Sequence, residues 1–158
     1  MAIPLTNALI LAIIRLMKKA VSTLADAQTQ ASWFTKIREA HQTETAEDYV
    51  ELIADLIEAN GEARVADLAT RFGVSNATVS KVIGRLNREG LVINKPYRSL
   101  FLSDAGRDLA KSCKERHEIV LRFLLKMGVP KDIAELDAEG IEHHISAETL
   151  AIFKKHAR

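Results

Sequence analysis

The sequence predicts a mainly α-helical protein with a small β-wing, in which a winged helix-turn-helix domain is followed by a second helical domain. Three observations predict this class. Apolar residues recur at helical spacing along most of the chain. A turn at Gly73 separates two short helical segments, and two short β-prone runs flank Lys95-Pro96-Tyr97-Arg98. With 158 residues, 47% of them hydrophobic, the chain can bury a core.

The first helix of this fold is expected from Asp48 to Ala59, because apolar side chains repeat along one face: Tyr49, Leu52, Ile53, Leu56 and Ile57. Asn60-Gly61 is a typical C-terminal cap. The helix could begin as early as Trp33, since Ser32 could cap it there. Residues 1–32 then form an N-terminal extension to which the sequence assigns no role. Its apolar run is too short to span a bilayer.

The helix-turn-helix is expected next, and with the first helix it makes a domain of residues 33–103. Arg64 to Phe72 forms a short helix, Gly73-Val74 turns the chain, and Ser75 caps a longer helix that ends near Arg88. Residues 91–94 and 99–102 are expected to be the two strands of the wing.

This order of elements predicts DNA binding, since the second helix of such a unit enters the major groove by its N-terminal end. Residues 61–102 carry seven basic and three acidic side chains, as expected for such a surface. The candidate DNA-binding residues are Ser75, Asn76, Thr78, Lys81, Arg85, Tyr97 and Arg98. Asn76 and Thr78 suit base edges, whereas the others suit the backbone or, on the wing, the minor groove. A solvated helix face and a protein-docking module are the alternatives.

Six potential metal ligands fall in three separate clusters: Asp48 and Glu51; His117; and Glu139, Glu142 and His143. Asp48 and Glu51, three residues apart, project from one helix face. The Glu-x-x-Glu-His spacing would let one helical turn offer three ligands to one ion. Oxygen-rich sets with imidazole suit divalent ions such as Mn²⁺ and Fe²⁺. The pattern therefore favours metal-controlled DNA binding.

Each cluster also has a simpler explanation. Asp48, Glu51 and Asp55 could be a solvated acidic stripe, and His117 has the apolar neighbours of a boundary histidine. We do not count His144 as a ligand, because it would point about 100° away from His143 on a helix. Electrostatics is the reason to join the clusters. Carboxylates brought together repel one another, and a divalent ion removes that penalty, so that binding can draw the segments together.

Four motifs carry a resemblance to a known family: Glu47-Asp-Tyr-Val-Glu51, Gly61-Glu-Ala-Arg-Val-Ala-Asp-Leu-Ala69, Arg116-His-Glu118 and Glu139-Gly-Ile-Glu-His-His144. Together they resemble the manganese transport regulator (MntR) branch of the diphtheria toxin repressor family. The resemblance implies a homodimeric winged-helix repressor whose helical C-terminal half, residues 104–158, pairs the subunits. It also implies a site for two Mn²⁺ ions per subunit, formed by the six candidate ligands.

The resemblance also bears on which metal is sensed. Iron-responsive members of the family carry methionine at the position of Asp48 and cysteine at that of Glu139. Oxygen in place of soft sulfur at both positions favours Mn²⁺. We expect two departures from the family pattern, namely the extension before Asp48 and the lack of the SH3-like third domain of the iron-responsive relatives.

The leading hypothesis is a Mn²⁺-responsive repressor of manganese-homeostasis genes that binds a palindromic double-stranded operator as a homodimer. The alternative is a winged-helix regulator that responds to Fe²⁺ or to a non-metal ligand. No catalytic motif such as His-Glu-x-x-His or a Walker A loop is present, so we expect neither an enzyme nor a small organic substrate. Cys113 is the only cysteine, which suggests a reducing cytoplasm, and we expect no membrane partner.

Overall fold

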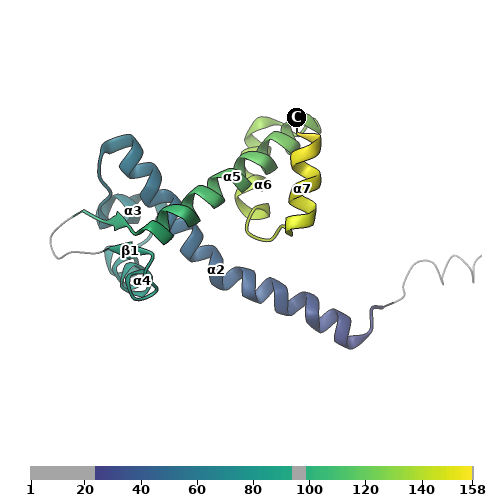
Figure 1. Cartoon of the computed structure of the whole chain (residues 1–158), viewed down its shortest axis with the longest axis horizontal. Coiled ribbons are helices and arrows are strands. Elements are labelled where there is room, and N and C mark those ends of the chain that lie inside the picture. Colours follow the sequence, from purple (N-terminus) through teal and green to yellow (C-terminus); the bar gives the residue numbers. More distant parts are fainter. Residues whose placement is uncertain (1–23, 94–98, 158) are drawn as a thin grey trace, which may run out of the picture. The chain divides into compact units, whose positions relative to one another are not determined.

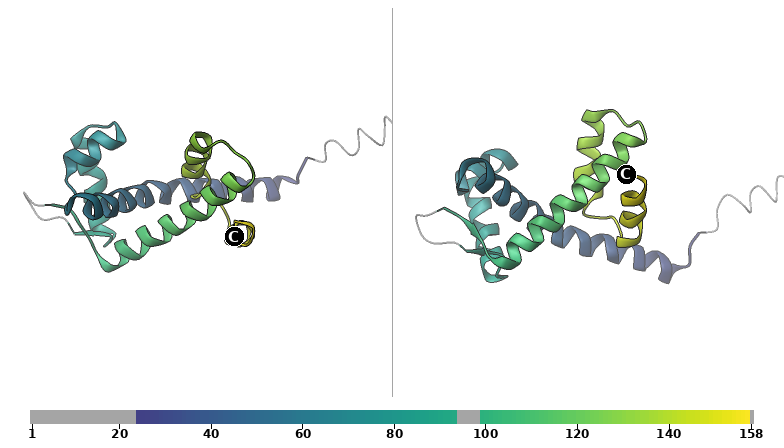
Figure 2. Two further views of the ribbon diagram at one scale, coloured as in Figure 1. Left: turned by 90° about the horizontal axis from the view of Figure 1, so that it is seen from above. Right: turned by 45° about the horizontal axis from the view of Figure 1, so that its top comes forward.

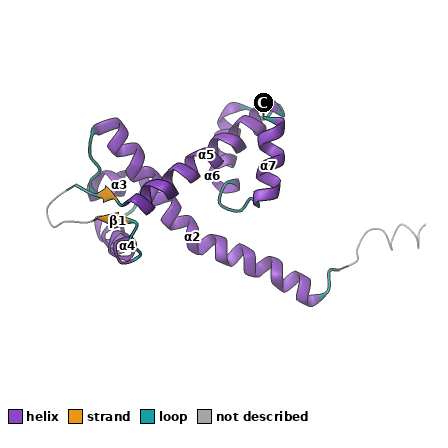
Figure 3. Cartoon of the chain, in the orientation of Figure 1, coloured by secondary structure: helices purple, strands orange, loops and turns teal. Residues whose placement is uncertain are grey.

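The computed structural model describes residues 24–93 and 99–157. The chain divides into two units, Met1–Lys36 and Ile37–Arg158, and the hydrophobic core and the site described below lie in the second. The described elements are α2 (Ala27–Asn60), α3 (Val65–Phe72), α4 (Asn76–Arg88), β1 (Val92–Ile93), β2 (Phe101–Leu102), α5 (Asp104–Lys126), α6 (Lys131–Ile141) and α7 (Ala147–His156). Helices dominate, and the strands form one small antiparallel pair (Figures 1 and 3), which confirms the predicted fold class.

Helix α2 begins earlier than the sequence suggested, at Ala27 rather than near Trp33. The cap is Asp26, whose Oδ1 accepts hydrogen bonds from the backbone N–H groups of Gln28 (3.1 Å) and Thr29 (2.9 Å). The predicted cap, Ser32, instead donates to the carbonyl oxygen of Thr29 at 2.7 Å and lies inside the helix. The end at Asn60 is as predicted, and the following Gly61 has a positive φ of 78°.

The helix-turn-helix forms as predicted. Gly73 ends α3 with φ 66° and ψ 31°, the left-handed conformation that glycine adopts without strain. Ser75 caps α4, since its hydroxyl oxygen accepts a hydrogen bond from the backbone N–H of Thr78 at 3.1 Å. Both helices are short and amphipathic, so their stability depends on burying their apolar faces.

One hydrophobic core joins α2 to the helix-turn-helix and the wing. Its largest fully buried side chains include Ile53 from α2, Leu68 from α3, and Ile83 and Leu86 from α4. The ring of Tyr49 on α2 stacks on that of Phe72 at the end of α3, with centroids 4.5 Å apart. Burial of each such side chain contributes about 1.5–3 kcal/mol, so α2 is an integral part of the helix-turn-helix domain.

The wing is anchored at its base. Val92 pairs with Leu102 and Ile93 with Phe101, and an isolated bridge joins Ala63 to Leu100. The strands are shorter than predicted, with two residues each. Residues 94–98 lie outside the described part of the chain, so Tyr97 and Arg98 are not placed.

Helix α5 connects the wing to the C-terminal helices (Figure 1). At its start, the hydroxyl of Ser103 donates to the carbonyl oxygen of Gly90 (2.6 Å) and accepts from the N–H of Gly106 (3.0 Å). Its second half packs against α6 and α7, as both views of Figure 2 show. Phe123 of α5 stacks on Phe153 of α7, with centroids 3.9 Å apart. Within the described ranges, no helix is long and apolar enough to cross a membrane.

Gly106 is a position where no side chain fits. A Cβ there would lie 2.1 Å from the carbonyl oxygen of Leu91, which is held by the N–H of Ser103 at 3.0 Å. Gly106→Ala is therefore expected to lower the free energy of unfolding by about 1–3 kcal/mol, as overpacking does. Chemical denaturation monitored by circular dichroism measures this change.

Gly84→Ala is the matched control, because a Cβ at that position in α4 meets only Arg88 Nη1, at 3.8 Å. This substitution should raise the free energy of unfolding by about 0.5–1 kcal/mol, through the helix preference of alanine. Equal stability of the two variants would contradict the close approach of α5 to the wing.

Candidate functional site

Side chains from three distant segments of the sequence lie close together, namely from α2, from α5 and from the end of α6. His143 Nε2 lies 3.0 Å from Asp48 Oδ1 and 3.5 Å from Glu142 Oε1. His117 Nδ1, on α5, lies 3.4 Å from Glu142 Oε2 and 3.7 Å from Glu139 Oε1. One imidazole therefore lies beside each oxygen of the Glu142 carboxylate, His117 beside Oε2 and His143 beside Oε1.

Glu51, the sixth predicted ligand, lies in the same region. Together with Asp48, Glu139 and His143 it lines an open pocket between α2 and α6. Burial, and then the negative charge of nearby Glu142, raises the pKa of Glu51 to about 7. The structure thus brings all six predicted residues together, and it places their carboxylates close enough to repel one another.

Glu142 is the central residue of this cluster. It is only 2% exposed, and among the residues that the structure describes no other charged residue is buried. Its Oε2 has no hydrogen-bond partner among the described residues, although His117 Nδ1 is near. A buried carboxylate oxygen without a hydrogen bond is costly, and a bound cation would compensate for that cost. A carboxylate and imidazole donor set around such an oxygen fits a hard or borderline divalent ion.

Both histidines are held in an acidic environment. Asp48, and then Glu47, raises the pKa of His143 to about 10. The pKa of His117 is also raised, mainly by Glu142. At neutral pH the imidazolium form of His143 therefore balances the carboxylates when no ion is bound, and a metal would have to take the place of its proton.

Glu47 and Arg116 also belong to the site, although neither was among the predicted site residues. Glu47 Oε2 lies 2.7 Å from His143 Nδ1 and 2.7 Å from Arg116 Nη2. This contact turns the Nε2 of His143 toward Asp48 and Glu142. Burial disfavours the Glu47 carboxylate, but His143 and Arg116 outweigh that effect and its pKa is lowered. The signals in the sequence were that each is adjacent to a predicted ligand and lies in one of the motifs that carry the family resemblance.

Cys113 lies one helical turn before Arg116 and is fully buried. Arg116 Nη2 lies 3.4 Å from its sulfur. Burial raises the pKa of the Cys113 thiol to about 12, so the thiol stays protonated at neutral pH.

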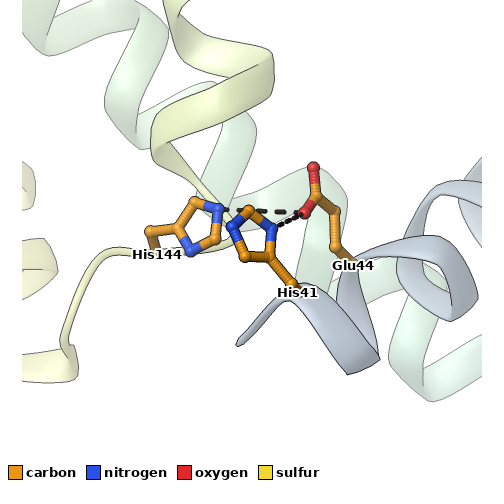
Figure 4. A group of neighbouring side chains, drawn as sticks. All are labelled: His41, Glu44 and His144. Atoms are coloured by element: carbon orange, nitrogen blue, oxygen red, sulfur yellow. Dashed lines mark hydrogen bonds and ion pairs between the residues drawn. The ribbon is translucent and has the colours of Figure 1, made fainter. Parts of the chain in front are cut away.

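The expectation that one helical turn carries Glu139, Glu142 and His143 is wrong in one respect. Helix α6 ends at Ile141, Glu142 is its cap residue, and His143 lies in the turn that follows. The N–H of Glu142 still bonds to the carbonyl oxygen of Ala138 at 3.1 Å, but that of His144 bonds back to Ile141. This tighter bond ends the helix. It leaves His144 beside Glu44 and His41 instead of in the main cluster (Figure 4).

The candidate DNA-binding residues of α4 differ in how available they are. Asn76 and Lys81 are exposed. The hydroxyls of Ser75 and Thr78 lie 2.9 Å apart, and that of Ser75 also caps the helix. Arg85 is half-buried, with its Nε 3.7 Å from a carboxylate oxygen of Glu89. Asn76 and Lys81 are therefore the side chains most available to a ligand on this face.

Comparison with known proteins agrees with this arrangement. Residues 41–100 match the model of the N-terminal DNA-binding domain of iron-dependent repressors, and residues 103–156 match their metal-binding and dimerisation domain. The transcriptional regulator MntR of Escherichia coli O6:H1 is 48% identical over 136 residues, covering 86% of this chain and 88% of that protein. MntR of Bacillus subtilis is 39% identical over 104 residues, 66% of this chain and 73% of that protein. Because the Escherichia coli match covers 136 residues, it reaches upstream of residue 41 into the N-terminal extension.

Solved structures show the same likeness. A manganese-dependent transcriptional repressor in complex with manganese matches with a TM-score of 0.65 and 31% identity, over 71% of this chain and 52% of that chain. The manganese regulator SloR matches with a TM-score of 0.62 and 26% identity, over 70% of this chain and 52% of that chain. The present chain thus corresponds to about half of each of those chains. The two domain matches and the sequence identities show that this chain belongs to the diphtheria toxin repressor family of metal-dependent regulators, in its MntR branch.

Proposed function

We propose that this protein is a Mn²⁺-responsive repressor of manganese-homeostasis genes, in which metal binding promotes operator binding. The observation that carries this proposal is the convergence of carboxylates and imidazoles on the buried Glu142. Two comparisons support it: the MntR relatives are transcriptional regulators, and one matched structure is a repressor bound to manganese.

The proposed metal ligands are Asp48, Glu51, His117, Glu139, Glu142 and His143. Two ions per subunit are supported by the way Glu142 faces both imidazoles, with Oε1 toward His143 and Oε2 toward His117. Ligand atoms of His117, Glu139 and Glu142 all lie within 4.8 Å of one another, which suits one ion. The second ion would lie on the other side of Glu142, where His143 Nε2 is 3.5 Å from Glu142 Oε1 and 3.0 Å from Asp48 Oδ1. The oxygen atoms of Asp48 and Glu139 favour Mn²⁺ over softer ions.

The coupling to DNA depends on α2. When bound, the ions supply positive charge that offsets the repulsion among the carboxylates. Asp48 and Glu51 then hold α2 against α5 and α6. Tyr49 and Ile53 of the same helix belong to the core that supports α4, so the position of α2 and that of the recognition helix are linked.

The proposed partners are a palindromic DNA operator and a second copy of the chain. Residues 33–103 would bind DNA, with α4 in the major groove and the wing beside it. Residues 104–158 would hold the metal and pair the subunits. Exposed apolar side chains on the C-terminal helices support such pairing: Leu125, Met127, Ile133, Leu136 and Ile152. A DNA-bound regulator of this kind would act in the cytoplasm and catalyse no reaction.

The direct test is a gel shift with operator DNA in the presence of Mn²⁺ and after its removal by a chelator. We expect tight binding only with Mn²⁺. Glu142→Gln removes the central charge while keeping the shape of the side chain, so it should abolish the Mn²⁺ response without unfolding the protein. Circular dichroism would verify the fold.

Glu135→Gln is the matched control, since Glu135 is an exposed residue of the same helix paired with Lys131 at 3.6 Å. This variant should respond to Mn²⁺ like the wild type. Operator binding that is equally tight after chelation, or a full response by Glu142→Gln, would rule out the proposed sensing role. A stronger response to Fe²⁺ than to Mn²⁺ would support iron sensing instead.

The affinity for Mn²⁺ should rise with pH. Glu51 (pKa about 7) and His143 (pKa about 10) both hold protons near neutral pH that metal binding must release. Below its pKa, each released proton should change the affinity by about tenfold per pH unit. Calorimetric titrations between pH 6 and pH 8, in buffers of different ionisation enthalpy, measure both the affinity and the protons released.

The folding stability of the metal-free protein should fall as pH rises. Both pKa values lie above the ordinary ones of 4.5 and 6.5, so the folded form binds these protons more tightly than the unfolded form. Their contribution to stability is lost as pH rises through about 7 for Glu51 and about 10 for His143.

For the binding measurement, a Mn²⁺ affinity that does not vary between pH 6 and pH 8 would contradict proton release by these two residues.

Lys81→Ala should weaken DNA binding several-fold, largely independently of sequence, because Lys81 is proposed to neutralise one phosphate. Because the homodimer would lose one phosphate contact in each subunit, the slope of log affinity against log salt concentration should become shallower by about 1.8. Fluorescence anisotropy with labelled operator at several salt concentrations measures this slope. Lys131→Ala, an exposed lysine on α6, is the control and should leave the slope unchanged. An unchanged slope for Lys81→Ala would exclude a phosphate contact.

A further inference from the structure

A second group of potential ligands lies outside the six residues assigned above. His41 and Glu44 come from α2, and His144 from the turn after α6. His41 Nδ1 lies 2.8 Å from Glu44 Oε2, and His144 Nε2 lies 3.8 Å from the same oxygen. The two imidazole rings meet edge to face, with centroids 4.7 Å apart (Figure 4). Each residue offers one ligand atom, and the three atoms all lie within 4.8 Å of one another.

This group borders the six-residue cluster, because Glu44 lines the same pocket as Asp48 and His143, but it consists of other side chains. The neighbouring His143 uses its Nδ1 for Glu47 and its Nε2 for Asp48, whereas His144 faces Glu44. His41 and Glu44 lie on α2 before Glu47, and Figure 4 shows their side chains directed toward His144. The two groups are therefore adjacent but use different side chains.

The donor types indicate the class of ion. Two imidazoles and one carboxylate are typical zinc ligands, with bonds of about 2.0–2.2 Å. Tetrahedral geometry then puts the ligand atoms about 3.3 Å apart, between the two distances of 2.8 Å and 3.8 Å observed to Glu44. The side chains of His41, Glu44 and His144 are 60%, 32% and 32% exposed, so small rotations are possible and water can complete the coordination. Imidazole-rich sites also bind Zn²⁺ more tightly than Mn²⁺.

We propose that His41, Glu44 and His144 form an additional site for a divalent cation of the zinc class. Such an ion would join α2 directly to the segment between α6 and α7. Because α2 also carries Asp48 and Glu51, the ion would restrain that helix beside the proposed manganese centre. This inference goes beyond the proposed function and does not depend on it.

The test is the number of Zn²⁺ ions bound by the full chain, measured by equilibrium dialysis and elemental analysis. His41→Ala should bind one Zn²⁺ fewer per chain than the wild type, while its Mn²⁺ count stays unchanged. His144→Gln should lose the same single ion. His156→Ala removes an exposed histidine of α7 that lies outside the group, so it should match the wild type.

A second readout is thermal stability. Zn²⁺ should raise the melting temperature of the His41→Ala variant by less than that of the wild type, and the shift caused by Mn²⁺ should be equal in the two proteins. Equal Zn²⁺ counts in wild type and His41→Ala would overturn the site. Loss of Mn²⁺ along with Zn²⁺ in that variant would also overturn it, by showing one shared centre. If neither protein binds Mn²⁺ but the Zn²⁺ counts differ, this site stands and the proposed function fails.

Discussion

The carboxylate of Glu142 is enclosed by protein and lies between two imidazoles, and the rest of the site depends on this position. The backbone N–H of Glu142 continues the hydrogen-bond ladder of α6, so the helix fixes where the side chain enters the cluster. Its two oxygens then face His117 of α5 and His143 of the following turn. A negative charge held in this way requires positive partners. The proton on His143 supplies positive charge in the absence of metal, and a cation can replace it.

The need for positive charge beside Glu142 affects the whole DNA-binding half, because α2 belongs both to the cluster around Glu142 and to the hydrophobic core. Helix α2 carries the proposed acidic ligands on one face and the apolar residues of the core on another. Tyr49 and Ile53 belong to that core, and their neighbours Asp48 and Glu51 belong to the cluster of proposed metal ligands. A shift of α2 that relieves repulsion among the carboxylates would therefore disturb the packing beneath α4. The proposed coupling needs no other element between the two, because one helix takes part in both.

Much of this arrangement could be predicted from the sequence. The turn at Gly73 and the cap at Ser75 are local signals, since glycine tolerates a positive φ and a serine hydroxyl satisfies a free N–H. The six clustered residues were identified by their spacing together with a family resemblance. Their spatial convergence follows from tertiary packing, which spacing alone does not determine.

Other features could not be predicted because they depend on contacts between distant residues. Glu47 is one acidic residue among several on α2, and its role follows only from its contact with His143. The end of α6 at Ile141 reflects a bond made by His144, and the preceding Gly140 alone does not fix where the helix ends. The start of α2 was missed because Asp26 and Ser32 are both acceptable caps, and a preference for one over the other is not encoded locally.

The buried thiol of Cys113 has a consequence for the chemical signals that this protein can receive. Oxidants and soft metals such as Cu⁺ react with thiolates, and a thiol with a pKa of about 12 supplies almost none at neutral pH. Its sulfur is also fully shielded from solvent. Peroxide and thiophilic metals therefore find no reactive sulfur at Cys113.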